Sequence, residues 1–188
     1  MSNLKDLTWE HHQNAERQDF VKVLMSGKIN PQFYATYLWN QHKKYDLMEA
    51  FATATGLLDD FPEIRRKQVI EQDYLELWKG EGTPPIVAST TEYINHMRDS
   101  LDKPDKVMAH IYVHHMGDLS GGQMIKRKIP GEGRMYQFEG DTKDIKERIR
   151  AKTHDGLAEE AKWAFSSATK LFQDLMELDI EHYMEQTD

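Results

Sequence analysis

Apolar residues along the chain recur at intervals of three and four positions, which is the spacing of an amphipathic helix. The clearest run spans residues 157–183, where one face carries Ala161, Ala164, Phe165, Ala168, Leu171, Phe172, Leu175 and Leu178. No segment alternates convincingly between apolar and polar positions, as a strand buried on one side does. The pattern therefore predicts an all-α fold, which we expect to be a single-domain helical bundle over residues 1–188.

Cap and turn residues divide the rest of the chain into further helices. Gly27 follows a first helix over residues 4–24. Asn30 and Pro31 form the start of a second helix, which Gly56 ends. The same reasoning predicts helices over residues 61–79, 90–101, 107–128 and 142–152, with loops at 80–85 and 130–133.

Composition narrows the classes of function. The chain has 188 residues and a formal net charge of -8, which argues against nonspecific nucleic-acid binding. It contains no cysteine, which excludes disulfides, thiolate nucleophiles, iron–sulfur clusters and cysteine-ligated zinc. Because there is no apolar run long enough to cross a bilayer and no secretory segment, we expect a soluble, cytoplasmic protein that does not bind membranes.

Residues 117–123, with the sequence GDLSGGQ, form the most unusual stretch. Three glycines in six residues cost a helix about 1 kcal/mol each relative to alanine. Gly117 and Gly121 are four positions apart and share a helix face, so their bare backbone admits the close approach of a flat ligand. Asp118 and Ser120 place polar groups beside that face. The pattern fits a bent helix and a loop between two helices equally well.

The first predicted helix carries two adjacent histidines. On a helical wheel, His11 lies near an apolar stripe, whereas His12 shares a stripe with Lys5, Thr8 and Glu16. Glu16 follows His12 by one turn and is placed to hold its second ring nitrogen, as metal-bound histidines require. Lys5 can meet a negative charge on a ligand. A single histidine on a helix is more often structural, so this stripe alone does not establish a metal site.

Two motifs together resemble the haem oxygenase family. Residues 4–16, LKDLTWEHHQNAE, are similar to the family pattern L-K-x-x-T-x-x-x-H-x-x-A-E, and residues 117–123 match G-D-L-S-G-G-Q. The similarity extends over most of the chain and is weakest at residues 56–105. It implies that haem is clamped between the first helix and a kinked distal helix. It also implies that His12, rather than His11, is the metal ligand, with Glu16 bound to its ring.

The resemblance implies further contacts with haem. Lys5, Lys146 and Arg150 match cations that bind the propionates. The other expected cofactor-binding residues are Thr8, Glu16, Tyr45, Tyr112, His114, Ser120, Gly122, Phe165 and Phe172. His114 is a departure, because the family commonly has arginine at this position in the distal hydrogen-bond network. We therefore expect this chain to organise its distal water differently.

The implied reaction is the O₂-dependent cleavage of haem to biliverdin, of the IX-alpha isomer by resemblance, with release of Fe²⁺ and CO. Gly117 and Gly121 would let the distal helix lie over the ring. We expect Asp118 to hold a water that delivers a proton during catalysis. Haem is then both substrate and cofactor, and the protein supplies orientation and electrostatics.

The reaction needs electrons, which we expect from reduced ferredoxin or a similar acidic donor. Lys126, Arg127 and Lys128 offer a basic docking surface directly after the glycine motif. More basic residues follow at Arg134, Lys143, Lys146, Arg148, Arg150 and Lys152. Acidic residues interrupt this series, so an ordinary solvated face fits it too. A bilin reductase, as in phycobilin biosynthesis, is a possible downstream partner.

Two alternatives remain open from sequence. His110, His114 and Asp118 recur at steps of four and share one helix face, which fits a helical di-metal oxidase. That enzyme would need ligands from partner helices, and the pair Glu181-His182 lies too close to the chain end to supply them convincingly. A haem carrier without catalysis would also use His12 and the glycine motif, and Asp118 is the residue that distinguishes it from an enzyme.

Overall fold

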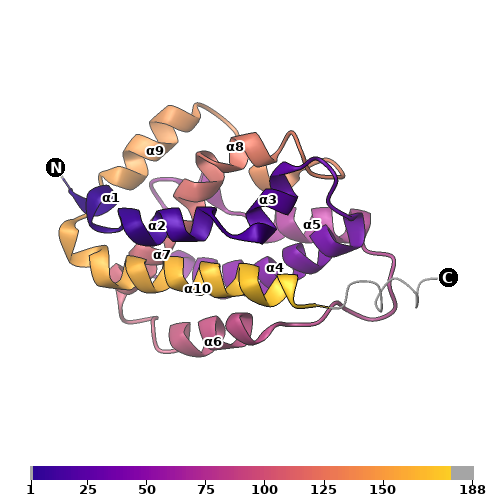
Figure 1. Cartoon of the computed structure of the whole chain (residues 1–188). Coiled ribbons are helices and arrows are strands. Elements are labelled where there is room, and N and C mark those ends of the chain that lie inside the picture. The colour runs from indigo at the N-terminus through magenta and orange to yellow at the C-terminus, as the bar shows by residue number, and fades with distance from the viewer. Residues whose placement is uncertain (1, 179–188) are drawn as a thin grey trace.

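The computed structural model describes residues 2–178, and within them all regular secondary structure is helical, as the apolar spacing predicted. Figure 1 shows the arrangement of these helices. The α-helices are α1 (Leu4–Leu7), α2 (Trp9–Glu16), α3 (Asp19–Met25), α4 (Pro31–Ala54), α5 (Lys67–Leu77), α6 (Ala88–Met97), α7 (Pro104–Leu119), α8 (Gly122–Ile125), α9 (Thr142–Arg150) and α10 (Ala158–Met176). Three 3₁₀ turns join them: η1 (Pro62–Ile64), η2 (Arg134–Tyr136) and η3 (Asp155–Leu157).

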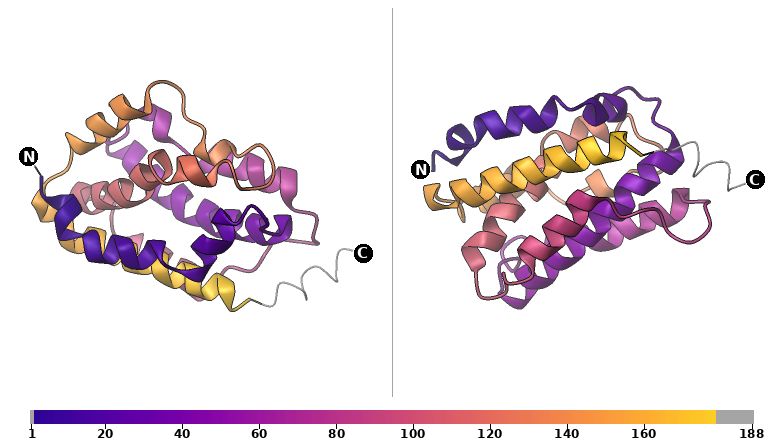
Figure 2. Two further views of the ribbon diagram at one scale, coloured as in Figure 1. Left: turned by 45° about the horizontal axis from the view of Figure 1, so that its top comes forward. Right: turned by 60° about the horizontal axis from the view of Figure 1, so that its bottom comes forward.

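The single helix predicted over residues 4–24 is wrong, because this segment forms α1, α2 and α3. The first break is at Thr8, whose hydroxyl donates to the carbonyl of Leu4 at 2.8 Å and whose backbone lies at φ -108° and ψ 3°. The second is at Gln18, which is extended. With these breaks, α2 and α3 both pack against α10, and α3 also contacts α8 (Figure 2).

The central helix α4 begins and ends as predicted. The side chain of Asn30 accepts a hydrogen bond from the backbone N–H of Gln32 at 2.8 Å, and Pro31 follows as the first helical residue. Gly56 adopts a positive φ of 77° just beyond the helix end. Helix α4 packs against α5, α6 and α7, and buried side chains occur around much of its circumference.

The helix predicted over residues 61–79 is also interrupted. It starts as the turn η1 and resumes as α5 at Lys67. The buried carboxylate of Glu49 accepts hydrogen bonds from the backbone N–H groups of Arg66, at 2.8 Å, and Lys67, at 3.1 Å. A side chain from α4 thus caps α5, which sequence spacing within α5 does not reveal.

The remaining predicted boundaries shift by a few residues. Helix α6 spans Ala88–Met97 rather than 90–101, and α9 ends at Arg150 rather than 152. Helix α10 ends at Met176, so the predicted continuation is wrong at residues 177–178, and its part over residues 179–183 lies outside the described residues. In Figure 1, α6 and α9 lie at opposite edges of the molecule, with α7 and α10 between them.

Buried apolar side chains from Leu4 on α1 to Leu175 on α10 form one continuous core. The helices α2, α4, α7 and α10 surround a cavity beside this core. Across residues 2–178, every helix is either too short or too polar to span a bilayer.

Candidate active site

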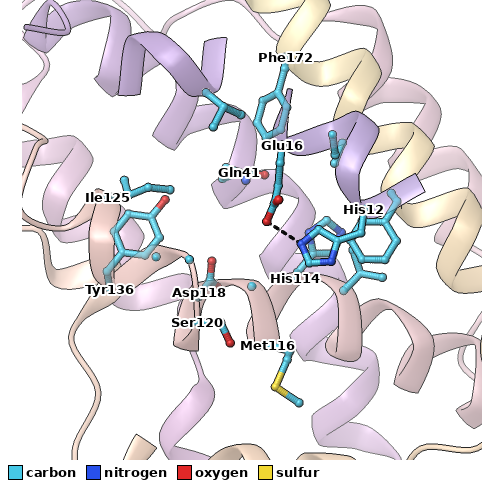
Figure 3. A pocket seen from close by; sticks show the side chains of 18 of the residues that line it. His12, Glu16, Gln41, His114, Met116, Asp118, Ser120, Ile125, Tyr136 and Phe172 are labelled. Atoms are coloured by element: carbon cyan, nitrogen blue, oxygen red, sulfur yellow. Dashed lines mark hydrogen bonds and ion pairs between the residues drawn. The ribbon is translucent and has the colours of Figure 1, made fainter. Parts of the chain in front are cut away.

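A cavity of about 250 Å³ opens between α2, α4, α7 and α10. Most of the residues predicted to form the site line it: His12, Glu16, Tyr45, Tyr112, His114, Gly117, Asp118, Ser120, Gly121, Gly122, Phe165 and Phe172. The structure therefore brings residues from both sequence motifs to one place. Figure 3 shows Glu16 and Asp118 projecting into the same space from opposite sides.

His12 is held on one wall of the cavity. Its Nε2 lies 2.7 Å from the Oε1 of Glu16, and its ring stacks on Phe165 with centroids 5.1 Å apart. Trp9 contacts the same ring edge-on. With one ring nitrogen bound to a carboxylate, the imidazole keeps the other available as a metal ligand. His11, the neighbouring histidine, is not part of the cavity wall.

The glycine motif forms the opposite wall, as a helix with an interruption. Helix α7 ends at Leu119, Ser120 leaves helical geometry at φ -106° and ψ -89°, and α8 starts at Gly122. A methyl group on Gly117 would meet no atom within 4 Å, and on Gly121 only the Gly117 carbonyl at 3.9 Å. This backbone is open to a ligand.

Gly122 differs from the other two glycines. A methyl group there would lie 2.5 Å from Cδ1 of Tyr136, so the glycine is needed for packing against this ring. Tyr136 comes from η2 and is buried. The third glycine thus secures the turn after α7, while Gly117 and Gly121 supply the bare backbone.

Asp118 is buried beneath the bare backbone. Its Oδ2 accepts a hydrogen bond from the hydroxyl of Tyr45 at 2.6 Å. Burial raises the pKa of Asp118 to about 7, although the charge of His115 and the Tyr45 hydrogen bond oppose this shift. A carboxyl group with a pKa near neutrality can both hold and release a proton under physiological conditions.

His114 adds an unsatisfied polar atom to the cavity wall. Its side chain is buried, and its Nε2 has no hydrogen-bond partner among the described residues. Burial lowers the pKa of His114 well below its usual value, and nearby Lys44 lowers it further, so the ring is neutral at pH 7. Buried polar atoms are normally satisfied, so this nitrogen points to a water or ligand in the cavity.

Sequence reasoning missed a second polar cluster in the cavity. Gln41 donates to the hydroxyl of Tyr37 at 3.1 Å, and that hydroxyl lies 3.2 Å from the hydroxyl of Tyr136. Tyr37, Gln41 and Tyr45 are spaced by four on α4, so they share a face, and this spacing was a usable signal. The remaining missed residues are apolar or small: Ala15, Val21, Val113, Met116, Ile125 and Ala168.

Four predicted residues do not line the cavity: Lys5, Thr8, Lys146 and Arg150. Thr8 is buried at the α1–α2 break, where its hydroxyl donates to the carbonyl of Leu4. Lys5 is exposed on α1, and Lys146 and Arg150 lie on α9. Burial raises the pKa of Tyr112, and the charge of Arg150 opposes this shift. Helices α1 and α9 lie at the same end of the molecule (Figure 2).

The basic surface is smaller than the sequence suggested. Arg134 pairs with Asp73 and Glu76, Arg148 with Glu63 and Asp144, and Lys152 with Asp60. These cations are therefore largely neutralised. Lys126, Arg127 and Lys128 are exposed directly after α8 and form no ion pair within residues 2–178. They remain the candidate docking surface.

The predicted di-metal face does not converge. Although His110, His114 and Asp118 follow one another along α7, His110 contacts Glu160 and Asp118 contacts Tyr45. The pair Glu181-His182, which was not a convincing source of further ligands, lies outside the described residues. The structure gives the di-metal alternative no support at this face.

Comparisons with known proteins agree with one another. A family model described as heme oxygenase matches residues 1–174. The chain is 30% identical over 202 residues to heme oxygenase 1 of Synechocystis sp. PCC 6803, covering 93% of this chain and 83% of that protein. The structure of heme oxygenase from Leptospira interrogans matches with a TM-score of 0.78 and 26% identity, over 90% of this chain and 96% of that one. A structure of Synechocystis heme oxygenase-1 in complex with heme matches with a TM-score of 0.75 and 26% identity, over 92% and 90%.

Proposed function

The chain belongs to the haem oxygenase family and is an oxidoreductase that cleaves haem, and from this premise we propose how its residues carry out the reaction and which products it forms. The products we assign are biliverdin IX-alpha, Fe²⁺ and CO, formed at the expense of O₂ and electrons. The cavity between α2 and α7 is the assigned site. The observation that carries the proposal is Asp118, buried with Tyr45 on the wall opposite His12.

The residues of the cavity fit a haem group. His12 offers an imidazole ligand whose ring is held by Glu16 and Phe165. The facing wall at Gly117 and Gly121 has no side chain to obstruct a flat ring. Bound haem supplies the iron at which O₂ is activated and the porphyrin that is cleaved.

Asp118 acts as the proton-relay residue. Its carboxyl lies at the cavity wall with a pKa raised to about 7 by burial, so it can bind a water and exchange a proton with it. Tyr45 fixes the carboxyl by donating to Oδ2, which leaves Oδ1 for the water. His114 lies on the same helix, its Nε2 has no hydrogen-bond partner within residues 2–178, and it takes part in holding the distal water.

Lys5, Lys146 and Arg150 bind the haem propionates. They lie on α1 and α9 at one end of the molecule, and Arg150 lies close enough to Tyr112 to lower the pKa of its hydroxyl. Cation–carboxylate hydrogen bonds at one end of the cavity would fix the rotation of the ring. Ring rotation decides which edge carbon faces the proton relay, and so decides the isomer.

Electrons come from an acidic donor such as reduced ferredoxin, which docks at Lys126, Arg127 and Lys128. These residues are exposed and follow α8, whose Gly122 and Ile125 line the cavity. The docking surface is thus joined to the cavity wall by one short helix. A bilin reductase would be the consumer of the pigment.

The proposal is tested by Asp118→Ala. We expect the variant to bind hemin as the unchanged protein does, because His12 is intact, but to lose most of its bile-pigment yield and to divert haem to other products. Asp105→Ala is the matched control, since Asp105 is an exposed aspartate on the same helix and outside the cavity. Full pigment yield from Asp118→Ala would remove the relay role.

A further inference from the structure

Three potential metal ligands meet outside the haem cavity. His96 of α6, His110 of α7 and Glu160 of α10 place their ligand atoms within 4.8 Å of one another. The Nε2 atoms of His96 and His110 lie 2.5 Å and 2.8 Å from the same Oε1 of Glu160. We propose that these three side chains form a binding site for a divalent transition-metal ion, separate from the haem site.

The donor set determines the class of metal. Two imidazoles and one carboxylate are the ligands that suit Zn²⁺ and Fe²⁺, whereas Mg²⁺ and Ca²⁺ prefer oxygen donors throughout. Three protein ligands also leave coordination positions open, and His96 and Glu160 are partly exposed to solvent. An ion can therefore enter from the surface. Since each ligand comes from a different helix, a bound ion would cross-link α6, α7 and α10.

Two aromatic side chains, Tyr93 and Trp163, orient the two imidazoles. The hydroxyl of Tyr93 lies 2.8 Å from Nδ1 of His110, and Trp163 stacks on the ring of His96 with centroids 3.5 Å apart. A tyrosine hydroxyl can donate or accept. Tyr93 therefore supports the tautomer in which His110 donates Nε2–H to Glu160 and also the one that offers a bare Nε2 to a metal. Such support of the non-coordinating nitrogen is usual for metal-bound histidine.

The cluster is distinct from the haem cavity. None of its three residues belongs to the cavity wall, although His114, one turn after His110 on α7, does. The inference does not rest on the proposed function. The proposed function bears only on the source of the ion, because haem cleavage would release Fe²⁺ within the same molecule, whereas Zn²⁺ would come from outside.

The test is metal titration of the full-length, haem-free protein by calorimetry, with thermal unfolding in parallel. Zn²⁺ and, under anaerobic conditions, Fe²⁺ are the probes, and Mg²⁺ is the hard-cation comparison. His96→Gln is the main variant because His96 is partly exposed and its loss should leave the fold intact; Glu160→Gln is the second. His154→Gln is the matched control, a half-exposed histidine outside the cluster.

We expect one ion of Zn²⁺ or Fe²⁺ per chain and a higher unfolding temperature, with no response to Mg²⁺. His96→Gln and Glu160→Gln should each weaken binding by about tenfold or more, since loss of a direct ligand exceeds the effect of losing its outer partner. Preference for Fe²⁺ or Zn²⁺ identifies the ion's source. His12→Ala tests whether the added metal binds instead at His12 and Glu16, the other histidine–carboxylate pair. The proposal is overturned if Zn²⁺ and Fe²⁺ do not bind, if both cluster variants bind as tightly as the unchanged protein, or if binding depends on His12 instead.

Discussion

Tyr45 donates a hydrogen bond of 2.6 Å to Oδ2 of Asp118, which joins the central helix α4 to the last turn of α7. The two residues are 73 positions apart in the chain. Both are buried, and burial raises the pKa of each above its usual value. The bond therefore fixes the position of a carboxyl group at the cavity wall whose pKa burial raises to about 7.

Removing this bond should shift the pH dependence of catalysis. Because the Tyr45 hydrogen bond lowers the pKa of Asp118, Tyr45→Phe should raise that pKa above about 7. The limb of the pH–rate profile that reports Asp118 should therefore move to higher pH. Loss of this buried hydrogen bond should also reduce the free energy of unfolding by about 1 kcal/mol. The profile of pigment formation against pH checks this, and an unchanged profile would separate Tyr45 from the relay.

Lys44 should weaken the fold at neutral pH. It is fully buried, its Nζ lies 4.8 Å from the Tyr93 ring centroid, and it has no hydrogen-bond partner within residues 2–178. Burial lowers its pKa to about 7, although the charge of Asp118 raises it. Between pH 7 and the unfolded pKa near 10.5, the unfolded chain binds more protons, so this residue makes stability rise with pH across that window.

Lys44→Met should therefore stabilise the protein at pH 7, by roughly 1–3 kcal/mol. The gain should shrink as pH rises toward 10.5 and the unfolded lysine loses its proton. Urea unfolding at several pH values measures this directly. Lys43→Met is the control, since Lys43 is the preceding residue on α4 and its amine lies over the Trp39 ring on the protein surface. A destabilised Lys44→Met would show that the amine has a partner that offsets its burial.

Replacement of Gly117 and of Gly122 by alanine should change the stability of the protein in opposite directions. Gly117→Ala adds a methyl group in open space on a helix, so it should raise stability by about 0.5–1 kcal/mol while weakening hemin binding. Gly122→Ala places its methyl 2.5 Å from the buried ring of Tyr136 and should lower stability by roughly 1–3 kcal/mol. Unfolding of the haem-free proteins and hemin titration test the pair. Equal stability of the two variants would contradict the assigned packing.

Replacement of His11 and of His12 on α2 should have different effects on the spectrum of the hemin complex. His12→Ala removes the imidazole that lines the cavity and should abolish the histidine-ligated ferric haem spectrum. His11→Ala should keep it, since His11 does not reach the cavity wall. Absorption spectra of the hemin complexes, with imidazole added to His12→Ala as a rescue, make the comparison. The opposite pattern would move the ligand by one residue.

Sequence reasoning predicted the features that depend on local patterns. The all-helical fold followed from apolar spacing, and the Asn30–Pro31 cap and Gly56 stop were correct because caps act within a few residues. The gathering of His12 and Asp118 at one cavity followed from two motifs read together. Residues that share one helix face recur at regular intervals in the sequence, so the sequence alone reveals them.

The features that sequence reasoning missed depend on contacts between segments that are distant in the chain. The start of α5 is set by Glu49 on α4, which no spacing within residues 61–79 reveals. Tyr136 reaches the cavity because the chain turns back after α8, and its packing on Gly122 is a tertiary contact. The basic surface was overestimated because Arg134 and Arg148 find acidic partners far away in the chain.

The most direct test of the whole account is an absorption time course. The purified protein is mixed with one equivalent of hemin, and ferredoxin, its reductase and NADPH are added in air. We expect the Soret band to decay while a broad red biliverdin band grows, with CO trapped and a single pigment isomer recovered. A Soret band that persists through reduction in air, with no pigment or CO, would contradict catalysis at this cavity and leave the protein a haem-binding module.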